Sequence, residues 1–309
     1  MTPIIRTILG DIPPQALGLC LPHEHLYGWP PAPFATEDLT LNSEDAAIRE
    51  LARFQAAGGG ALVEMTTPDY NRDAAALERI ARASGVHIIA ATGYNKEKFS
   101  APFLQDATVE ELAARFSGEV THGMDGTSCR AGLIKASSTL NEISPLAEKL
   151  FRAAAQAHHT TGAPISTHTE KGTMALEQVA LLTGEGVEPS HMIIGHIDLR
   201  LEWEFVLALA RTGVFIGFDQ VSKAQYAPDS RRVEFIVRLV AEGHAGQLLL
   251  SGDLARRSYW HSYGLGGAGF TYILQVFAPM LRQAGLAEET VRGLLVDNPA
   301  RALAFTPRS

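Results

Sequence analysis

The chain has 309 residues, of which 46% are hydrophobic and 19% are charged, a composition typical of globular proteins. We expect a single domain over residues 1–309, because a chain of this length can bury one large core. The formal net charge of −8 excludes a broad nucleic-acid-binding surface, which needs the opposite sign.

Short apolar runs recur along the chain and predict strands. Before the first, residues 7–17 predict a small hairpin that turns at Gly10 and Asp11. Most of the runs are continuous rather than alternating, which indicates strands buried on both faces of a parallel sheet. We expect eight of them, at 17–21, 61–65, 86–91, 131–134, 164–167, 192–195, 214–218 and 247–251.

Helical spacing of apolar residues appears between these strands. The segment 43–57 opens with Ser43, a favoured capping residue, and glycines such as Gly85 and Gly162 follow others. Strands that alternate with helices indicate βαβ units, and eight of them favour a closed (β/α)8 barrel. We expect helices at 43–57, 73–84, 146–161, 174–182, 201–211 and 232–242, and two closing helices at 270–285 and 288–305.

Residue types that bind metal ions follow several of the predicted strands. In a β/α barrel such positions meet at one mouth, where catalytic groups collect. His23 and His25 are two apart, so on a strand both rings project to the same side and Glu24 points the other way, towards the helices. Neutral imidazole is a favoured zinc ligand. The expected ligands are His23, His25, Lys135, His168, His196 and Asp253.

Lys135 is the sharpest single clue, because burying a lysine at the end of an apolar strand is costly. Its amine can act as a Schiff-base nucleophile, as in a lyase. Alternatively it reacts with carbon dioxide to form a carbamate whose oxygens bridge two cations. The bare ammonium cannot bind metal, because it has only donors. The four histidines favour the carbamate. Asp253 is expected to bind one ion and accept a proton from a bridging water.

These residues, in this order, resemble the phosphotriesterase family of the amidohydrolase superfamily. The resemblance covers nearly the whole chain and rests on segments such as Pro22-His23-Glu24-His25, Thr167-His168-Thr169 and Ser251-Gly252-Asp253. It implies a (β/α)8 barrel with two divalent ions, usually zinc, with manganese, cobalt or iron as alternatives. It also implies a homodimer. His23, His25 and Asp253 would hold the buried ion and His168 and His196 the exposed one, with carboxylated Lys135 and a hydroxide as bridges.

Within the family the resemblance leaves several ester substrates open. The loops after the seventh and eighth strands often form a phosphate site in barrels, and here they carry cations. Lysine offers a point charge and arginine a bidentate fork for phosphate oxygens. The candidate substrate residues are Asn95, Lys223, Tyr226, Arg256, Arg257 and Tyr259, and we expect Arg257 rather than Arg256 to face the site.

We therefore expect a hydrolase that opens a small phosphorylated sugar lactone. The alternatives are a phosphotriester hydrolase, an unphosphorylated lactone hydrolase, a Schiff-base lyase that uses Lys135, and a binding protein without catalysis. For Lys223, Arg256 and Arg257 the alternative to a phosphate site is that they are rim charges, either solvated or paired with acidic neighbours. The two separated cysteines, Cys20 and Cys129, suit a reducing compartment. With neither a signal peptide nor an 18-residue apolar run, we expect a cytoplasmic protein that contacts no membrane.

Overall fold

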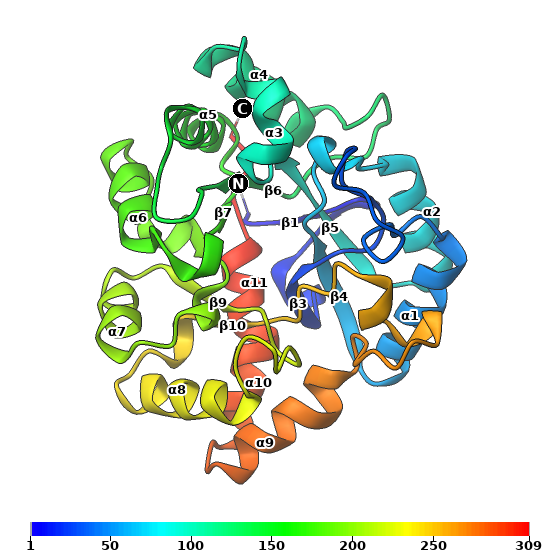
Figure 1. Cartoon of the computed structure of the whole chain (residues 1–309), viewed down its shortest axis with the longest axis vertical. Coiled ribbons are helices and arrows are strands. Elements are labelled where there is room, and N and C mark those ends of the chain that lie inside the picture. Colours follow the sequence, from blue (N-terminus) through cyan, green and yellow to red (C-terminus); the bar gives the residue numbers. More distant parts are fainter. Residues whose placement is uncertain (1, 309) are drawn as a thin grey trace.

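Eight parallel strands form a barrel around which the helices are arranged (Figure 1). The structure is a computed structural model that describes residues 2–308. Each strand pairs with the next one along the chain, as the (β/α)8 prediction requires. The strands are β3 (Leu19–Glu24), β4 (Gly59–Glu64), β5 (His87–Gly93), β6 (Leu133–Ser137), β7 (Ile165–His168), β8 (Met192–Ile194), β9 (Phe215–Phe218) and β10 (Leu248–Leu250).

Side chains as well as backbone bonds connect the first strand, β3, to the last, β10. The backbone N–H of Asp253 donates to the carbonyl of His23 over 3.1 Å. The hydroxyl of Ser251 accepts the N–H of His23 over 3.0 Å and donates to Glu24 over 2.8 Å. The junction between β3 and β10 is therefore made by the predicted ligands His23 and Asp253 and by the nearby residues Glu24 and Ser251.

The inside of the barrel is filled by side chains rather than left as a channel. Inward-facing residues such as Val63, Ile89 and Leu133 form one buried cluster, which Ile5 and Leu303 join. A larger cluster packs the outer faces of the strands against the helices. Because the interior is solid, only the loops at one end of the strands can hold a cavity for chemistry.

The outer helices agree with the predicted ones within a few residues. Ser43 caps the first helix by accepting the N–H of Ala46 over 3.2 Å, and Gly162 ends another in the left-handed conformation at φ 83°. The matching helices are α1 (Glu44–Ala56), α2 (Ala74–Ser84), α5 (Pro145–Thr161), α6 (Ala175–Gly184), α7 (Trp203–Arg211) and α8 (Asp229–Ala241).

Two helices between β5 and β6 were not predicted, α3 (Glu97–Leu104) and α4 (Val109–Thr121). Pro102 lies inside α3 and obscures its pattern. The sequence does carry a signal for α4, because Thr108 and Glu111 form a reciprocal capping box at its start.

The predicted hairpin is confirmed, but its turn is wrong by two residues. Strands β1 (Ile5–Thr7) and β2 (Gly10–Ile12) pair so that Gly10 lies opposite Thr7, and the chain turns before Gly10. Asp11 is in the second strand because its carboxylate binds the guanidinium of Arg6 at 2.8 and 2.9 Å.

The two predicted closing helices are each interrupted by a wider π-helical turn, over Ile273–Phe277 and Gly293–Asp297. Each turn comes shortly before a proline, Pro279 or Pro299, which cannot donate to the helical ladder. The regular parts are α9 (Ala278–Gln283), α10 (Glu288–Arg292) and α11 (Asn298–Leu303).

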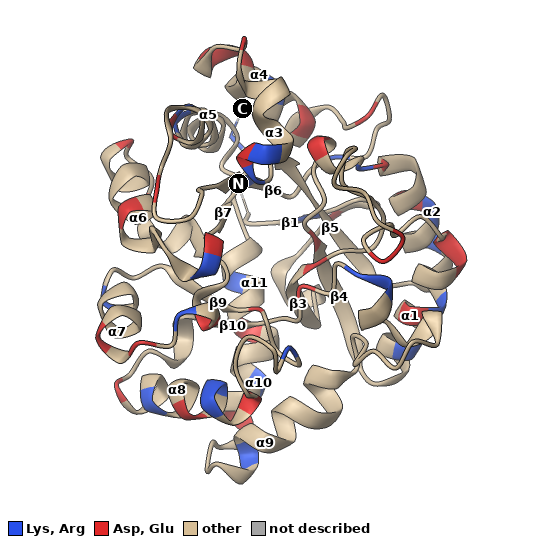
Figure 2. Cartoon of the chain, viewed as in Figure 1, with Lys and Arg blue, Asp and Glu red and all other residues tan. Residues whose placement is uncertain are grey.

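Charged residues of both signs are interspersed on the outer helices (Figure 2). Cys20 and Cys129 are both buried and free. Within residues 2–308, no helix has the length and apolar character needed to cross a bilayer.

Candidate metal centre

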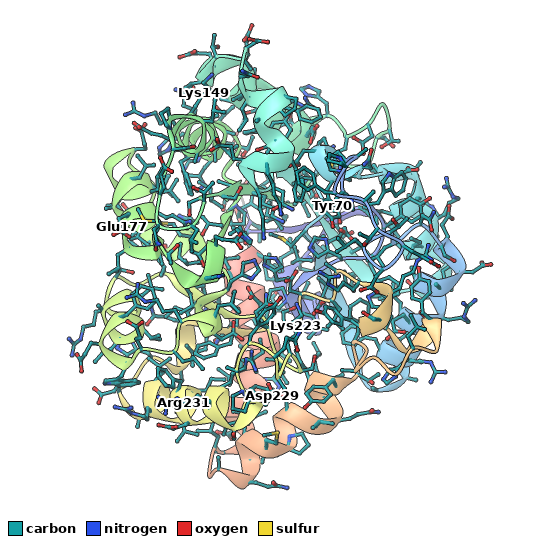
Figure 3. All side chains as sticks on the ribbon, viewed as in Figure 1. Tyr70, Lys149, Glu177, Lys223, Asp229 and Arg231 are labelled. Carbon is teal, nitrogen blue, oxygen red and sulfur yellow. The ribbon has the colours of Figure 1, made fainter. Side chains whose placement is uncertain are left out.

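The structure brings all six predicted ligand residues into the wall of one cavity of about 210 Å³. The cavity lies at the carboxyl ends of the strands. His23 is near the end of β3, Lys135 is in the middle of β6 and His168 ends β7, whereas His25, His196 and Asp253 follow β3, β8 and β10 within three residues. Figure 3 shows two further wall residues, Tyr70 and Lys223, near the middle of the barrel, and Glu177 and Arg231 on its outer helices.

His23, His25 and Asp253 form the first group that can hold a metal ion. Their potential ligand atoms all lie within 4.8 Å of one another. Asp253 Oδ1 is 3.3 Å from His25 Nε2 and 3.9 Å from His23 Nε2. Ligands about 2.0–2.2 Å from a shared ion are separated by distances of this order.

His168 and His196 lie beside this group. The centroids of their rings are 4.4 Å apart, and that of His196 is 4.7 Å from the centroid of His23. Both His196 (φ 62°) and Asp253 (φ 47°) have the left-handed backbone conformation, which is costly for residues other than glycine. Two of the six predicted ligands therefore have a strained backbone.

The hydrogen bonds of the rings test whether these residues fit a metal. His196 Nδ1 lies 2.6 Å from Asp219 Oδ1, and His25 Nδ1 lies 2.8 Å from Thr66 Oγ1. Both contacts orient the ring and leave Nε2 for an ion, the usual arrangement around metal sites. His168 binds Glu170 through Nε2 at 3.2 Å and keeps Nδ1 free. Burial lowers the pKa of His23 to about 3 and so favours the neutral ligand form.

Asp219, which follows β9, contacts two of the candidate ligands and was not among the predicted site residues. Its carboxylate accepts the backbone N–H of His196 at 3.0 Å as well as facing its ring, and it lies 3.4 Å from His23 Nδ1. Since Asp219 is not in the cavity wall, it supports two ligand rings rather than facing the cavity itself. The sequence did contain a signal for Asp219, because a carboxylate directly follows an apolar strand there, much as the predicted ligands follow theirs.

Buried carboxylates satisfy backbone N–H groups at this end of the barrel, where strand pairing stops. Glu64 accepts the N–H of Thr66 over 2.8 Å, and Asp69 accepts that of Asn95 over 3.1 Å. In residues 2–308, neither Glu24 nor Glu64 forms an ion pair with lysine or arginine. Burial raises the pKa of Glu24 to about 7 and also raises that of Glu64, while the hydrogen-bond donors around each carboxyl group oppose the shift.

Lys135 is almost completely buried, with 1% of its surface exposed. Its ammonium donates to the carbonyl of Met65 over 2.8 Å. Burial lowers the pKa of Lys135 to about 8, against the opposing effect of Asp253. A neutral amine, which attack on a carbonyl or on carbon dioxide requires, is therefore accessible close to neutral pH.

Five of the six predicted substrate residues also lie in the cavity wall, but the preference for Arg257 was wrong. Arg256 lines the cavity, whereas Arg257 turns away and binds Thr40 O at 2.7 Å and Glu37 at 3.1 Å. Both partners of Arg257, the carbonyl of Thr40 and the carboxylate of Glu37, belong to the loop after β3. The five wall residues are Asn95, Lys223, Tyr226, Arg256 and Tyr259.

Two more cations line the cavity after β5, Lys96 from the loop and Lys98 from the first turn of α3. Lys96 pairs with Glu170 at 2.8 Å, and the ammonium of Lys98 lies 4.8 Å from the centroid of Phe99. Neither lysine was among the predicted substrate residues. With these residues the wall carries a concentration of positive charge in a chain whose net charge is −8. An anionic ligand is therefore attracted to the cavity.

Lys223 uses its three N–H donors within the protein. It donates to Gln220 Oε1 over 2.8 Å, to Asp253 O over 2.6 Å and to Asp253 Oδ2 over 3.2 Å. Burial alone would raise the pKa of Asp253, but Lys223 and the neighbouring histidines lower it well below its usual range. The carboxylate of Asp253 is thus ionised, and Lys223 must exchange a partner before it binds a ligand.

The barrel, its cluster of histidine and carboxylate ligands and its cationic cavity define a hydrolase class. The model of the phosphotriesterase family matches residues 3–303, and the chain belongs to this family. It is a hydrolase that acts on ester bonds.

Similar proteins agree with this assignment. The phosphotriesterase homology protein of Escherichia coli is 36% identical, over 92% of this chain and 97% of that protein. A phospho-furanose lactonase of Mycoplasmopsis synoviae is 34% identical, over 97% of this chain and 91% of that one. The structure of a lactonase from Listeria monocytogenes superposes with a TM-score of 0.93 at 35% identity, covering 98% of this chain and 99% of that chain.

Proposed function

We propose that the protein is a two-metal lactonase that opens a small phosphorylated sugar lactone. The observation that carries this proposal is the convergence of Lys135, four histidines and Asp253 in one cavity whose wall is cationic. The names of the Mycoplasmopsis and Listeria relatives support the choice of lactone.

In this proposal His23, His25 and Asp253 hold one divalent ion, and His168 and His196 hold the other. Zinc fits the imidazole and carboxylate ligands, and manganese, cobalt and iron are also compatible with them. Two bound ions would lower the pKa of a water molecule and polarise the ester carbonyl.

Lys135 contributes as a carbamate. Its neutral amine attacks the carbon of carbon dioxide, a proton leaves the nitrogen, and the product carries a carboxylate in place of the ammonium. This change converts a group with only donors into an oxygen ligand. The lowered pKa of Lys135 favours the step.

Asp253 is the proton acceptor. Its Oδ1 faces the histidines, whereas its Oδ2 accepts Gln220 Nε2 over 2.8 Å and faces Lys223. These contacts fix the carboxylate, so the proton that water loses during attack on the ester has a defined destination.

The anionic end of the substrate is bound by cations of the cavity wall. Arg256 is held by Asp38 at 3.1 Å and keeps further donors for a phosphate. Tyr259, Lys96 and Lys98 add donors around the same space. A neutral phosphotriester would leave these charges unpaired, so a phosphorylated lactone fits the cavity better.

The substrate assignment is tested with metal-loaded protein and three esters. We compare kcat/KM for a phosphorylated sugar lactone, for the same lactone without phosphate and for a neutral phosphotriester. The phosphorylated lactone is expected to be preferred by roughly a hundredfold, because charge-assisted hydrogen bonds contribute about 1.5–3 kcal/mol each. Equal rates for the two lactones would contradict the phosphate specificity, and cleavage of the triester alone would contradict a lactonase.

The adjacent arginines provide a matched pair of variants. Arg256→Met is expected to lower kcat/KM for the phosphorylated lactone by about 10- to 100-fold and to leave the unphosphorylated lactone nearly unchanged. Arg257→Met, which removes a cation outside the cavity, is expected to stay within about twofold of the parent. The reverse order of effects would show that Arg257 contacts the substrate.

A further inference from the structure

Glu24 is the middle residue of the His23-Glu24-His25 segment, and it is not one of the proposed metal ligands. Alternate side chains of a strand point to opposite sides, so Glu24 faces away from the cavity that the two histidines line. Its side chain is completely buried. With Gly252, Leu254 and Phe270 it lines a second, much smaller cavity.

The carboxylate of Glu24 binds the chain on both sides of Asp253. Glu24 Oε1 accepts the N–H of Gly252 over 2.7 Å and the hydroxyl of Ser251 over 2.8 Å. Glu24 Oε2 accepts the N–H of Leu254 over 2.8 Å. The residues before and after Asp253 are thus anchored by one buried side chain.

This anchoring explains how Asp253 keeps its unusual backbone. At φ 47° a residue other than glycine is strained, and it stays there only where its surroundings hold it. The N–H of Asp253 itself donates to His23 O over 3.1 Å, so three consecutive N–H groups are fixed to β3 and its end. The segment is also tightly packed, because a Cβ on Gly252 would lie 3.0 Å from the side chain of Leu254.

We propose that Glu24 is a positioning residue that fixes the left-handed turn at Asp253 and so aims its carboxylate at the ion shared with His23 and His25. The segment His23-Glu24-His25 then supplies two ligands, and its middle residue positions a third ligand, Asp253. The inference rests on the proposed metal centre. It assigns Glu24 no contact with ion or substrate.

The test is Glu24→Gln in the full-length protein, with the affinity for zinc measured by competition with a chromophoric chelator. Glutamine keeps the size of the side chain, but its NH2 group faces one of the backbone donors. One of the two ions is expected to bind about 10- to 100-fold more weakly, as for other residues that support metal ligands, and the other ion is expected to keep its affinity. We also expect kcat to fall while KM changes less than about threefold, because the substrate-facing cations do not move.

A milder variant and a control separate positioning from general stability. Ser251→Ala removes only the hydroxyl and is expected to lower the affinity for the same ion by a smaller factor. Glu119→Gln alters a buried glutamate that accepts Thr92 Oγ1 at 2.7 Å and Arg72 at 2.8 Å outside the cavity wall. This control is expected to lower the melting temperature and to leave both zinc affinities unchanged.

Unchanged affinity for both ions in Glu24→Gln would overturn the positioning role, and so would equal losses in Glu24→Gln and Glu119→Gln. A wild-type protein that binds no zinc would overturn the metal centre itself, a result that the same titration distinguishes.

Discussion

Replacing Lys135 with alanine is expected to lower kcat/KM by about a thousandfold or more, equivalent to at least about 4 kcal/mol of transition-state stabilisation. Lys135 is buried among the proposed ligands, and an alanine side chain has no atom that could bridge two ions. The measurement is a steady-state assay of the metal-loaded variant on the preferred lactone.

Added formate or acetate provides the control for this variant. The cavity left by the lysine side chain admits a small carboxylate, whose oxygens can replace those of the carbamate. Part of the activity is therefore expected to return in a concentration-dependent way. Full activity of Lys135→Ala without added carboxylate would contradict the bridging role. Trapping of a substrate adduct on wild-type Lys135 by borohydride would instead favour the Schiff-base lyase.

Replacing Asp253 with asparagine is expected to lower kcat by about 100- to 10,000-fold, the usual contribution of a general base. Asparagine has nearly the same shape, but its amide cannot accept the proton, and it binds a cation more weakly than a carboxylate. The ion pair with Lys223 at 3.2 Å is lost as well. The measurement is kcat under saturating substrate and metal.

The matched control for this change is Asp73→Asn. Asp73 caps α2 by accepting the N–H of Ala76 over 2.9 Å, and asparagine is an equally good capping residue. We expect its kcat to equal that of the parent. Activity of Asp253→Asn within a few-fold of the parent would show that another group accepts the proton.

Much of the fold could be predicted because its signals are local. Continuous apolar runs identified the buried strands, and the capping residue Ser43 and the glycine Gly162 marked helix ends that the structure confirms. The helices α3 and α4 were missed, since Pro102 breaks the expected pattern and the capping box at Thr108 was not recognised. The π-helical turns before Pro279 and Pro299 were also missed, because the effect of these prolines on the helices was not recognised.

The candidate ligands could be located for a similar reason. A residue directly after a barrel strand has little freedom, so its position in the sequence indicates which end of the barrel it faces. Loop residues further from a strand lack this constraint. Whether Arg256 or Arg257 faced the cavity was decided by Glu37 and Asp38, more than 200 residues earlier in the chain.

Supporting residues were the hardest to predict. Asp219 and Glu24 act through backbone N–H groups and rings that come from other strands, and no spacing in the sequence reveals those contacts. Only the assembled barrel brings these carboxylates to the N–H groups that they accept.

Anomalous X-ray diffraction from crystals grown with zinc tests the central claim most directly. The account predicts two zinc peaks about 3.5–4 Å apart, one beside His23 and His25 and the other beside His168 and His196, with density for a carboxylate on Lys135 between them. A single peak away from these histidines, or two peaks with an unmodified Lys135 facing neither, would contradict it.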